Sequence, residues 1–513
     1  MMNYNLHNLL YPWIKNAPNI NIKNIVSDSR IAMYGDLFIA IPGEKKDGRN
    51  YILQAIKQNV SAVISETTKT KKHGEIEIFK NTPIIYLSSL HKNISKIAGR
   101  FYDNPSNSLN LIGITGTNGK TTISHLTSQW TTILGKKSAV MGTIGNGIIN
   151  HHIYQTKNTT DSAIYIQKFL SKLKKLGINF VSLEVSSHSL SQYRIEHLKF
   201  SAAIFTNLSY EHIDYHNNMK NYELTKWKLF SKIKVKKYII NANDKIGKKW
   251  LLNLQSITNP KNIVAVSSNY IPNFFPYWKG QWIYASKIYY NSKNTYINFK
   301  SNWGNEIIHS PLIGKHNVNN ILLTISTLLT LGYPLKKLIQ TSKKLKQIIG
   351  RMEIFQTTKK PKIIIDYAHN PKALQQALIT AKHHCYGKLW CIFGCGGNRD
   401  KNKRHIMGKI SEKYSDMIII TNDNPREENQ KKIIDEIKKG IKNKKIQIIY
   451  NRTKAIQTAI EKASQKDLIL IIGKGHEIYQ IFNKKYYMYS DRITIQKLLG
   501  LKYNDTMQSP YYI

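Results

Sequence analysis

The chain has 513 residues, a formal net charge of +45, 41% hydrophobic and 10% aromatic residues. Single cores rarely grow beyond ~250–300 residues, so this length predicts about three domains with ample apolar content. No run approaches the ~18 apolar residues of a membrane span, which argues against a membrane protein. The lysines are scattered over the whole length, which argues against a nucleic acid as the specific partner.

The N-terminal sequence MMNYNLHNLLYPW has no basic segment leading into an apolar one, so no export signal is evident. Three cysteines are too few for a disulfide framework and fit a reducing compartment. We therefore expect a cytoplasmic protein.

The first predicted domain covers residues 1–109. Short β-rich runs begin at Asp36, Val60 and Pro83, with turns between them. The turn-rich segment 102–108 reads as a linker to the next domain. This pattern predicts a small α/β unit.

A glycine-rich turn opens the second predicted domain, residues 110–346. Residues 113–122 read GITGTNGKTT, between an apolar run and a helical pattern. Glycines let backbone N–H groups approach phosphate oxygens, and the helix N-terminus adds positive potential. The strict phosphate-loop pattern fails by one residue, because Ile114 stands where a glycine is required. We still predict a nucleotide site, with Lys120 reaching the outer phosphates and Thr121 ligating Mg²⁺.

The rest of the second domain alternates strands and helices, which predicts a mostly parallel sheet flanked by helices. Strand-like runs begin at Ser138, Phe180, Ala202 and Lys237, and a helix from about Asn317 closes the domain. Three polar residues stand near strand ends, namely Glu184, His188 and His212. They are either metal or phosphate contacts or ordinary polar residues. Lys226 by itself reads as a surface lysine.

The third predicted domain, residues 347–513, has a Rossmann-like pattern. Its apolar strands begin at residues 362, 389, 417, 446 and 468. Polar motifs follow four of them, at the edge where open parallel sheets bind ligands. Arg399 and Arg426 are forked donors on two of these loops and suit a dicarboxylate ligand, and Glu477 could neutralise its ammonium group.

Taken together, these motifs resemble one family. GITGTNGKTT, LEVSSHSL, TNLSYEHIDYH, GKHNVNN, GRME, DYAHNP and DNPR occur in the order of the Mur ligases, and the likeness spans nearly the whole chain. The resemblance implies a UDP-binding N-terminal domain, a central ATP-binding domain and a C-terminal domain that binds the incoming amino acid. The DNPR motif, residues 423–426, is similar to the family's diaminopimelate-selecting motif.

The resemblance also implies a reaction. The γ-carboxylate of UDP-N-acetylmuramoyl-L-alanyl-D-glutamate attacks the γ-phosphate of ATP, and an acyl phosphate and ADP form. The amine of meso-diaminopimelate then displaces phosphate to give an amide. ATP and Mg²⁺ are the expected cofactors, and the enzyme is expected to act as a monomer.

The family's site residues map onto matching positions of this sequence. The catalytic and metal set would be Lys120, Thr121, Glu184, His212 and Lys226, the last as a carbamate. ATP would contact Gly116, Thr117, Asn118, Gly119, Lys120, Thr121, Thr122, Asn317, Arg351 and Asp366. The UDP end would contact Ser27, Ser29, Glu44, Lys45 and Lys46. The muramoyl dipeptide would contact Asn158, Thr159, Thr160, Ser186, Gln192 and Arg194. Diaminopimelate would contact Arg399, Asp423, Asn424, Pro425, Arg426, Gly473 and Glu477.

Two alternatives stay open. One keeps the fold and changes the acceptor, as in a lysine-adding ligase or a folylpolyglutamate-synthase-like enzyme. The other is a basic nucleic-acid-binding ATPase, motivated by the charge of +45.

Overall fold

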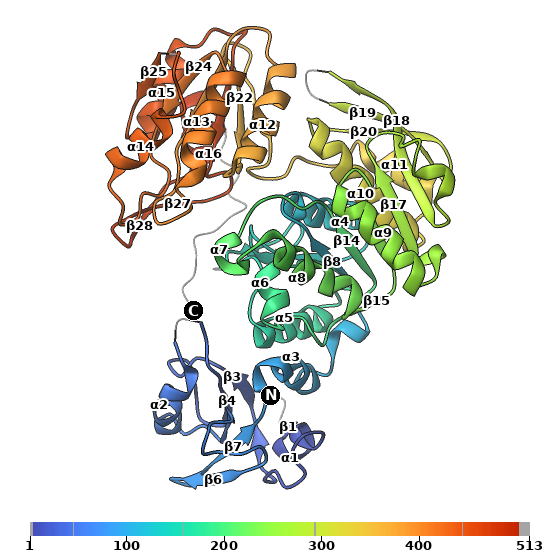
Figure 1. Cartoon of the computed structure of the whole chain (residues 1–513), viewed down its shortest axis with the longest axis vertical. Helices are drawn as coiled ribbons and strands as arrows, with labels where there is room; N and C mark the ends of the chain where they lie inside the picture. Colours follow the sequence, from blue (N-terminus) through green and yellow to red (C-terminus); the bar gives the residue numbers. More distant parts are fainter. Residues whose placement is uncertain (1–3, 45, 157, 292–293, 444, 502–513) are drawn as a thin grey trace.

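The computed structural model describes residues 4–501 except 45, 157, 292–293 and 444. Three α/β domains follow one another along the chain (Figure 1), and each is built on one large sheet. The N-terminal domain lies at one end of the long axis, and the C-terminal domain lies beside the central one at the other. No helix in these described residues is long and apolar enough to cross a membrane.

The N-terminal domain contains a five-stranded sheet in the order β3-β4-β5-β7-β6, in which β6 alone is antiparallel to its neighbour. Apolar side chains on both faces of the sheet form two cores. The strands are β3 (Asn24–Val26), β4 (Asp36–Ala40), β5 (Ala62–Glu66), β6 (Ile76–Phe79) and β7 (Thr82–Leu87), and the main helices are α1 (Leu6–Leu10), α2 (Ile52–Lys57) and α3 (Leu90–Phe101).

The central domain contains an eleven-stranded, mostly parallel sheet in the order β11-β10-β9-β12-β8-β14-β16-β17-β18-β19-β20. Its strands are β8 (Asn110–Thr115), β9 (Ser138–Met141), β10 (Asn146–Ile148), β11 (Ile153–Tyr154), β12 (Phe180–Glu184), β14 (Ala202–Phe205), β16 (Tyr238–Asn241), β17 (Ile263–Ser267), β18 (Gln281–Tyr290), β19 (Thr295–Ser301) and β20 (Glu306–Ser310). A separate strand pair joins β13 (Lys199–Phe200) to β15 (Lys234–Val235).

Helices cover both faces of this central sheet, and each face has its own apolar core. The helices are α4 (Lys120–Ile133), α5 (Ala163–Lys175), α6 (Ser187–Ser191), α7 (Ile213–His216), α8 (Met219–Ser231), α9 (Lys245–Ile257), α10 (Lys315–Thr330) and α11 (Leu335–Ser342). The two buried helices α4 and α10 pack against one another, which places the start of α10 beside the glycine-rich turn.

The C-terminal domain contains a six-stranded sheet in the order β21-β22-β26-β23-β24-β25, parallel except for β21. Its strands are β21 (Glu353–Phe355), β22 (Lys362–Asp366), β23 (Leu389–Phe393), β24 (Met417–Ile420), β25 (Ile446–Ile448) and β26 (Leu468–Ile472), and β27 (Tyr479–Phe482) pairs with β28 (Lys485–Met488). Its helices are α12 (Pro371–His383), α13 (Asn402–Tyr414), α14 (Gln430–Lys438), α15 (Arg452–Lys462) and α16 (Asp491–Leu499).

The fold class predicted from the sequence is confirmed. Every strand-like run named above forms a strand, and the closing helix of the central domain begins two residues before Asn317. The antiparallel extension β18–β20 was not predicted. The limits 1–109, 110–346 and 347–513 stay predictions, although each of the three large sheets lies within one of these ranges.

Candidate active site

The glycine-rich turn lies between the central strand β8 and helix α4. Gly116 and Gly119 have φ values of 142° and 91°, which L side chains rarely adopt. A Cβ atom on Gly116 would lie 1.9 Å from Thr206 Oγ1, and one on Gly119 would lie 2.7 Å from Asn320 Oδ1. Only glycine therefore permits this close approach of backbone to its neighbours.

The turn is held by the loop that follows β14, the strand next to β8. Thr117 N donates to the carbonyl of Asn207 at 2.8 Å, and Asn118 N donates to Asn207 Oδ1 at 3.1 Å. Thr206 Oγ1 donates to the carbonyl of Asn118 at 2.6 Å. Parallel strands end at the same edge of a sheet, which is why residues about 90 positions apart meet here.

Two lysine amines converge on this turn. Lys120 Nζ donates to the carbonyls of Gly116 and Thr117 at 2.9 and 2.8 Å, and Lys226 Nζ donates to the Gly116 carbonyl at 3.0 Å. Lys226, on α8, is 1% exposed and is not the surface residue that its sequence context indicated. Burial lowers the pKa of both amines, and the nearby charge of Lys120 lowers the pKa of Lys226 further.

Glu184 ends β12, the other neighbour of β8, and is fully buried. Its carboxylate accepts from Thr121 Oγ1 at 3.0 Å, from the backbone N–H of Thr143 at 2.9 Å and from Thr143 Oγ1 at 3.0 Å. A buried carboxylate beside a phosphate loop offers the hard oxygen ligands that Mg²⁺ prefers.

His212 occupies the N-cap position of the short helix α7, without a side-chain capping bond. Its ring lies 5.2 Å from that of His188 and 6.2 Å from that of Tyr222, measured between ring centroids. Burial lowers the pKa of His212 to about 4 and also lowers that of His188. Both imidazoles are therefore neutral at pH 7, the form in which histidine ligates a metal.

The metal ligands expected from the resemblance are compatible with Mg²⁺, but they do not form a ready-made cluster. In the described part of the chain, no group of three or more His, Cys, Asp or Glu side chains is arranged to hold a metal ion. The expected set contains only two such side chains, Glu184 and His212. Thr121 and a modified Lys226 would have to complete it.

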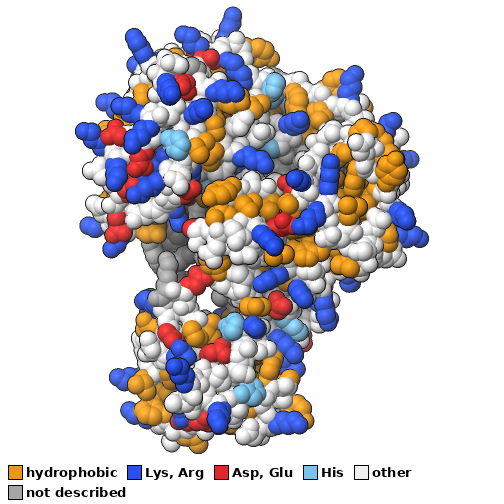
Figure 2. All heavy atoms as spheres, in the orientation of Figure 1, with side chains coloured by type: hydrophobic (Ala, Val, Ile, Leu, Met, Phe, Trp, Pro, Cys, Tyr) orange, Lys and Arg blue, Asp and Glu red, His pale blue; other side chains and the backbone are white. Residues whose placement is uncertain are grey.

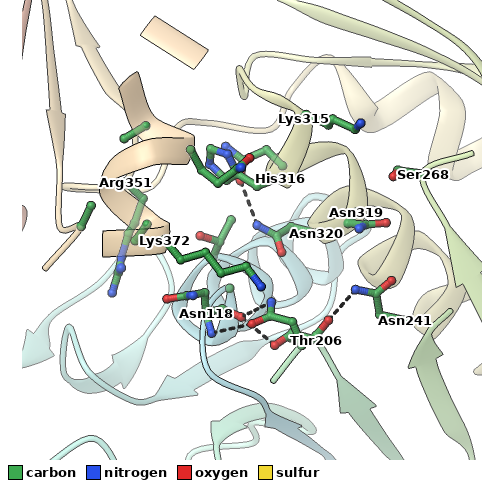
Figure 3. Close-up of a pocket in the computed structure, with 18 of the residues that line it drawn as sticks. Asn118, Thr206, Asn241, Ser268, Lys315, His316, Asn319, Asn320, Arg351 and Lys372 are labelled. Carbon is green, nitrogen blue, oxygen red and sulfur yellow. Dashed lines mark hydrogen bonds between the residues drawn. The ribbon is translucent and has the colours of Figure 1, made fainter. Parts of the chain in front are cut away.

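A cavity of about 460 Å³ lies between the central and C-terminal domains, beside the glycine-rich turn. Figure 3 shows Asn118 and Thr206 entering it from the central domain and Arg351 and Lys372 from the C-terminal domain. The three further ATP contacts expected from the sequence, Asn317, Arg351 and Asp366, all line it. Asn118, Gly119 and Thr122 of the glycine-rich segment line the same cavity, whereas Gly116, Thr117, Lys120 and Thr121 are not among its lining residues.

Arg351 links the two domains at this cavity. Its Nη2 donates to Thr121 Oγ1 at 3.1 Å, and its guanidinium lies 4.6 Å from the ring centroid of Tyr367. Asp366 accepts from the backbone N–H groups of Met352 and Ala368, each at 2.8 Å. A second link joins His369 Nε2 to Glu211 Oε1 at 3.0 Å.

Most of the residues expected to hold the muramoyl dipeptide are joined by hydrogen bonds beside Glu184. Thr160 Oγ1 donates to the Glu184 carbonyl at 2.7 Å and to Ser186 Oγ at 3.1 Å. Arg194 Nη1 donates to the Thr160 carbonyl at 2.5 Å, and its Nε donates to Gln192 Oε1 at 2.9 Å. Two more expected residues precede Thr160: Thr159 accepts from Thr143 Oγ1, and Asn158 is exposed.

The expected UDP contacts lie in the N-terminal domain. Ser27, Glu44 and Lys46 are exposed, whereas Ser29 is buried and donates to Gln54 Oε1 at 2.9 Å. Glu44 reaches the central domain, where it accepts from Gln192 Nε2 at 2.6 Å. Lys45 lies outside the described residues.

The expected acceptor residues gather at the carboxyl ends of β23, β24 and β26. A Cβ atom on Gly396 would lie 2.9 Å from Arg426 Nη1 and 3.7 Å from Arg399 Cγ, so both arginines flank the same glycine. Glu477 accepts from Asn424 Nδ2 at 3.0 Å and from Lys474 Nζ at 2.9 Å. The rest of the expected set is Asp423, which lies 3.6 Å from Lys474 Nζ, the buried Pro425, and Gly473, which has a φ of 117°.

Sequence reasoning missed several residues of this region. Thr143 was not singled out, because no motif marks the loop after β9. Lys474 is fully buried between Asp423 and Glu477; the polar motif 473–477 was noted at the end of its strand, but no role was assigned to this lysine. The Glu211–His369 hydrogen bond joins residues 158 positions apart, so it can be recognised only once the packing of the two domains is known.

Three consecutive parts of the chain match models of one protein family. Residues 21–102 match the Mur ligase family catalytic domain, residues 114–328 match the Mur ligase middle domain, and residues 350–475 match the Mur ligase glutamate ligase domain.

Two curated relatives are named UDP-N-acetylmuramoyl-L-alanyl-D-glutamate--2,6-diaminopimelate ligase. The one from Buchnera aphidicola subsp. Schizaphis graminum (strain Sg) is 50% identical over 503 residues, which is 98% of this chain and 100% of the relative. The one from Buchnera aphidicola subsp. Acyrthosiphon pisum (strain APS) is 50% identical over 493 residues, which is 96% and 98%. A solved structure of a ligase with this name is 30% identical, has a TM-score of 0.69, and is matched over 97% of this chain and 99% of that one.

Proposed function

This chain belongs to the Mur ligase family, and we propose that it joins meso-diaminopimelate to UDP-N-acetylmuramoyl-L-alanyl-D-glutamate with cleavage of ATP to ADP and phosphate. The enzyme is an ATP-dependent ligase that forms an amide bond in peptidoglycan precursor synthesis. The observation that carries the proposal is the placement of a phosphate loop and an arginine-flanked acceptor site in two domains that meet at Arg351.

In the first step, the glutamate γ-carboxylate attacks the γ-phosphate of ATP, an acyl phosphate forms, and ADP leaves. The N-terminus of α4 and the amine of Lys120, which lies at the start of that helix, would face the phosphates, where negative charge develops. Mg²⁺ held by Thr121, Glu184, His212 and a carbamylated Lys226 would neutralise phosphate oxygens. The protein's part in this step is therefore to position the reactants and to stabilise charge.

In the second step, the diaminopimelate amine attacks the acyl carbon, and phosphate leaves. Arg399 and Arg426 would hold carboxylates of the incoming amino acid, and Glu477 would face an ammonium group. Each charge-assisted contact contributes roughly 1.5–3 kcal/mol. L-Lysine lacks the second carboxylate, so it forfeits such contacts, and this favours diaminopimelate over the lysine alternative.

The nucleic-acid alternative receives no support from the face of the molecule drawn in Figure 2. Figure 2 shows Lys and Arg side chains spread over the visible face, among apolar and uncharged polar groups, instead of gathered over one element. A cytoplasmic location and a monomeric state remain predictions.

The proposal is tested by phosphate release with one reactant omitted at a time. We expect release to require ATP, Mg²⁺, the UDP-dipeptide and meso-diaminopimelate together. The proposal would be contradicted if phosphate release did not depend on the amino acid. It would also be contradicted if phosphate release rose with RNA and did not depend on the UDP-dipeptide.

A further inference from the structure

A buried arginine, Arg404, joins the two loops that carry the acceptor arginines. It lies on α13 and is 0% exposed. Its Nη1 and Nη2 donate to Glu428 Oε1 and Oε2 at 2.7 and 2.8 Å, which is a bidentate pair. Nη2 also donates to the carbonyl of Gly396 at 3.1 Å, and Nη1 donates to Glu436 Oε2 at 2.7 Å. One guanidinium thus contacts the loop after β23 and a carboxylate that follows the DNPR motif.

Glu428 makes a second set of contacts to the same loop. Its Oε2 accepts from the backbone N–H of Asn398 at 3.1 Å, and Asn398 Oδ1 accepts from the backbone N–H of Glu427 at 3.3 Å. The backbone N–H of Gly397 donates to the Asn424 carbonyl at 2.9 Å. Hydrogen bonds therefore join the loops after β23 and β24 at several points.

These hydrogen bonds between the two loops fix the surroundings of Arg426. This residue has a φ of 55°, in the left-handed region that non-glycine residues rarely adopt. Its Nη1 donates to the Gly397 carbonyl at 2.9 Å, and its backbone N–H donates to the Ile481 carbonyl at 3.0 Å. Moving the loop after β23 would remove an acceptor that orients this guanidinium, and it would also shift Arg399, which lies on that loop.

We propose that Glu428, through its pair with Arg404 and its bond to Asn398, is a positioning residue that sets the spacing of Arg399 and Arg426 and thereby the selection of a diamino dicarboxylic acid. This inference rests on the proposed function, because it assigns the two arginines to the acceptor. The carboxylates of Glu428 and Glu436 also offset the charge of Arg404, which is not itself exposed to the acceptor. Preorganised contacts of this kind raise affinity because less order is lost on binding.

The chain offers a matched control in Glu436. Like Glu428, it is an ion-pair partner of Arg404 at 2.7 Å, but it lies within α14 and not next to either loop. The test compares wild type, Glu428→Ala, Glu428→Gln and Glu436→Ala in phosphate-release kinetics with meso-diaminopimelate and with L-lysine. Thermal unfolding of each variant reports the purely structural loss.

We expect Glu428→Ala to raise the KM for meso-diaminopimelate by about tenfold or more, to leave the KM for ATP within about twofold, and to lower the preference for meso-diaminopimelate over L-lysine by a similar factor. Glu436→Ala should lower thermal stability comparably and leave the acceptor KM within about twofold. Glu428→Gln, which keeps an acceptor oxygen, should fall between wild type and Glu428→Ala, and it serves as the test variant if Glu428→Ala does not fold.

The experiment distinguishes failure of the positioning role from failure of the proposed function. If wild type shows meso-diaminopimelate-dependent release and the Glu428 variants keep its acceptor KM, or change it no more than Glu436→Ala does, the positioning role is wrong and the proposed function stands. If wild type shows no phosphate release that depends on meso-diaminopimelate, the proposed function is wrong, and the inference that rests on it is wrong as well.

Discussion

The amines of Lys120 and Lys226 donate to one acceptor, the carbonyl oxygen of Gly116, at 2.9 and 3.0 Å. Two protonated amines on one oxygen would repel each other, and burial disfavours their charge as well. A neutral, buried Lys226 is the form that attacks CO₂, and the resulting carbamate is an anion. Carbamylation would therefore turn repulsion between the two lysines into attraction.

The first prediction is that Lys226 takes up CO₂. In ¹³C-bicarbonate, wild type should show a carbamate carbon signal by NMR, because burial lowers the pKa of the Lys226 amine and so favours the unprotonated form that reacts with CO₂. Lys226→Gln should lack the signal and lose most of its activity. Lys220→Gln, which changes an exposed lysine of the same helix, should keep both. A signal that persists in Lys226→Gln would place the carbamate elsewhere.

The second prediction concerns the hydroxyl of Thr121, which donates to Glu184 and accepts from Arg351. Thr121→Val leaves a buried carboxylate with one partner fewer, so kcat/KM for ATP should fall by roughly 10- to 100-fold. Thr121→Ser keeps the hydroxyl and should stay near wild type. Equal losses in both variants, measured by steady-state kinetics, would show that the methyl packing of Thr121 and not its hydroxyl is what matters.

The third prediction separates acceptor from nucleotide binding. Arg426→Ala should raise the KM for meso-diaminopimelate by roughly 10- to 100-fold, since at least one charge-assisted contact is lost, and should leave ATP affinity nearly unchanged. Lys279→Ala, at an exposed position of the central domain, is a control for the loss of one positive charge. Comparable losses for both substrates in Arg426→Ala would contradict the role assigned to this residue.

The fourth prediction is a pH dependence of stability. The hydrogen bond from Arg404 lowers the pKa of Glu428 from its usual 4.5 to about 2. A carboxyl group that is more acidic in the folded state stabilises the fold fully above pH 4.5, and this contribution is lost as the pH falls toward 2. The difference in unfolding free energy between wild type and Glu428→Gln should therefore be largest at neutral pH and shrink below about pH 4.5. Urea unfolding curves at several pH values measure this difference in unfolding free energy. A difference that does not change with pH would contradict the ion pair between Arg404 and Glu428.

Much of the fold was predictable because local sequence determines it. Asn370-Pro371 shows this: the Asn370 side chain accepts from Ala373 N at 2.9 Å and Pro371 opens α12, so the helix begins directly after the loop that follows Asp366. The extension β18–β20 was missed because β18 alternates buried and exposed residues only in part, and its pairing with β19 shifts register between Ala285 and Lys287. Its partners across the sheet decide its structure more than its own sequence does.

The site was predictable to the extent that motifs stand at strand ends. Lys226 shows the limit of this reasoning. Its burial comes from the packing of α8 against the phosphate loop, about 110 residues away in sequence, and only the family resemblance selected it. The Glu211–His369 link and the Arg404–Glu428 pair likewise depend on how separate segments pack, which no local pattern contains.

The central claim, that a carboxyl group activated by ATP is captured by an amine selected in the C-terminal domain, is tested most directly by one competition experiment. The enzyme is supplied with ATP, Mg²⁺, the UDP-dipeptide and equal concentrations of meso-diaminopimelate and L-lysine, and the nucleotide product is identified by mass spectrometry. The account predicts a product whose mass has increased by one diaminopimelate residue, formed together with equimolar ADP and phosphate. A product that carries lysine, or ATP cleavage without any amide product, would contradict it.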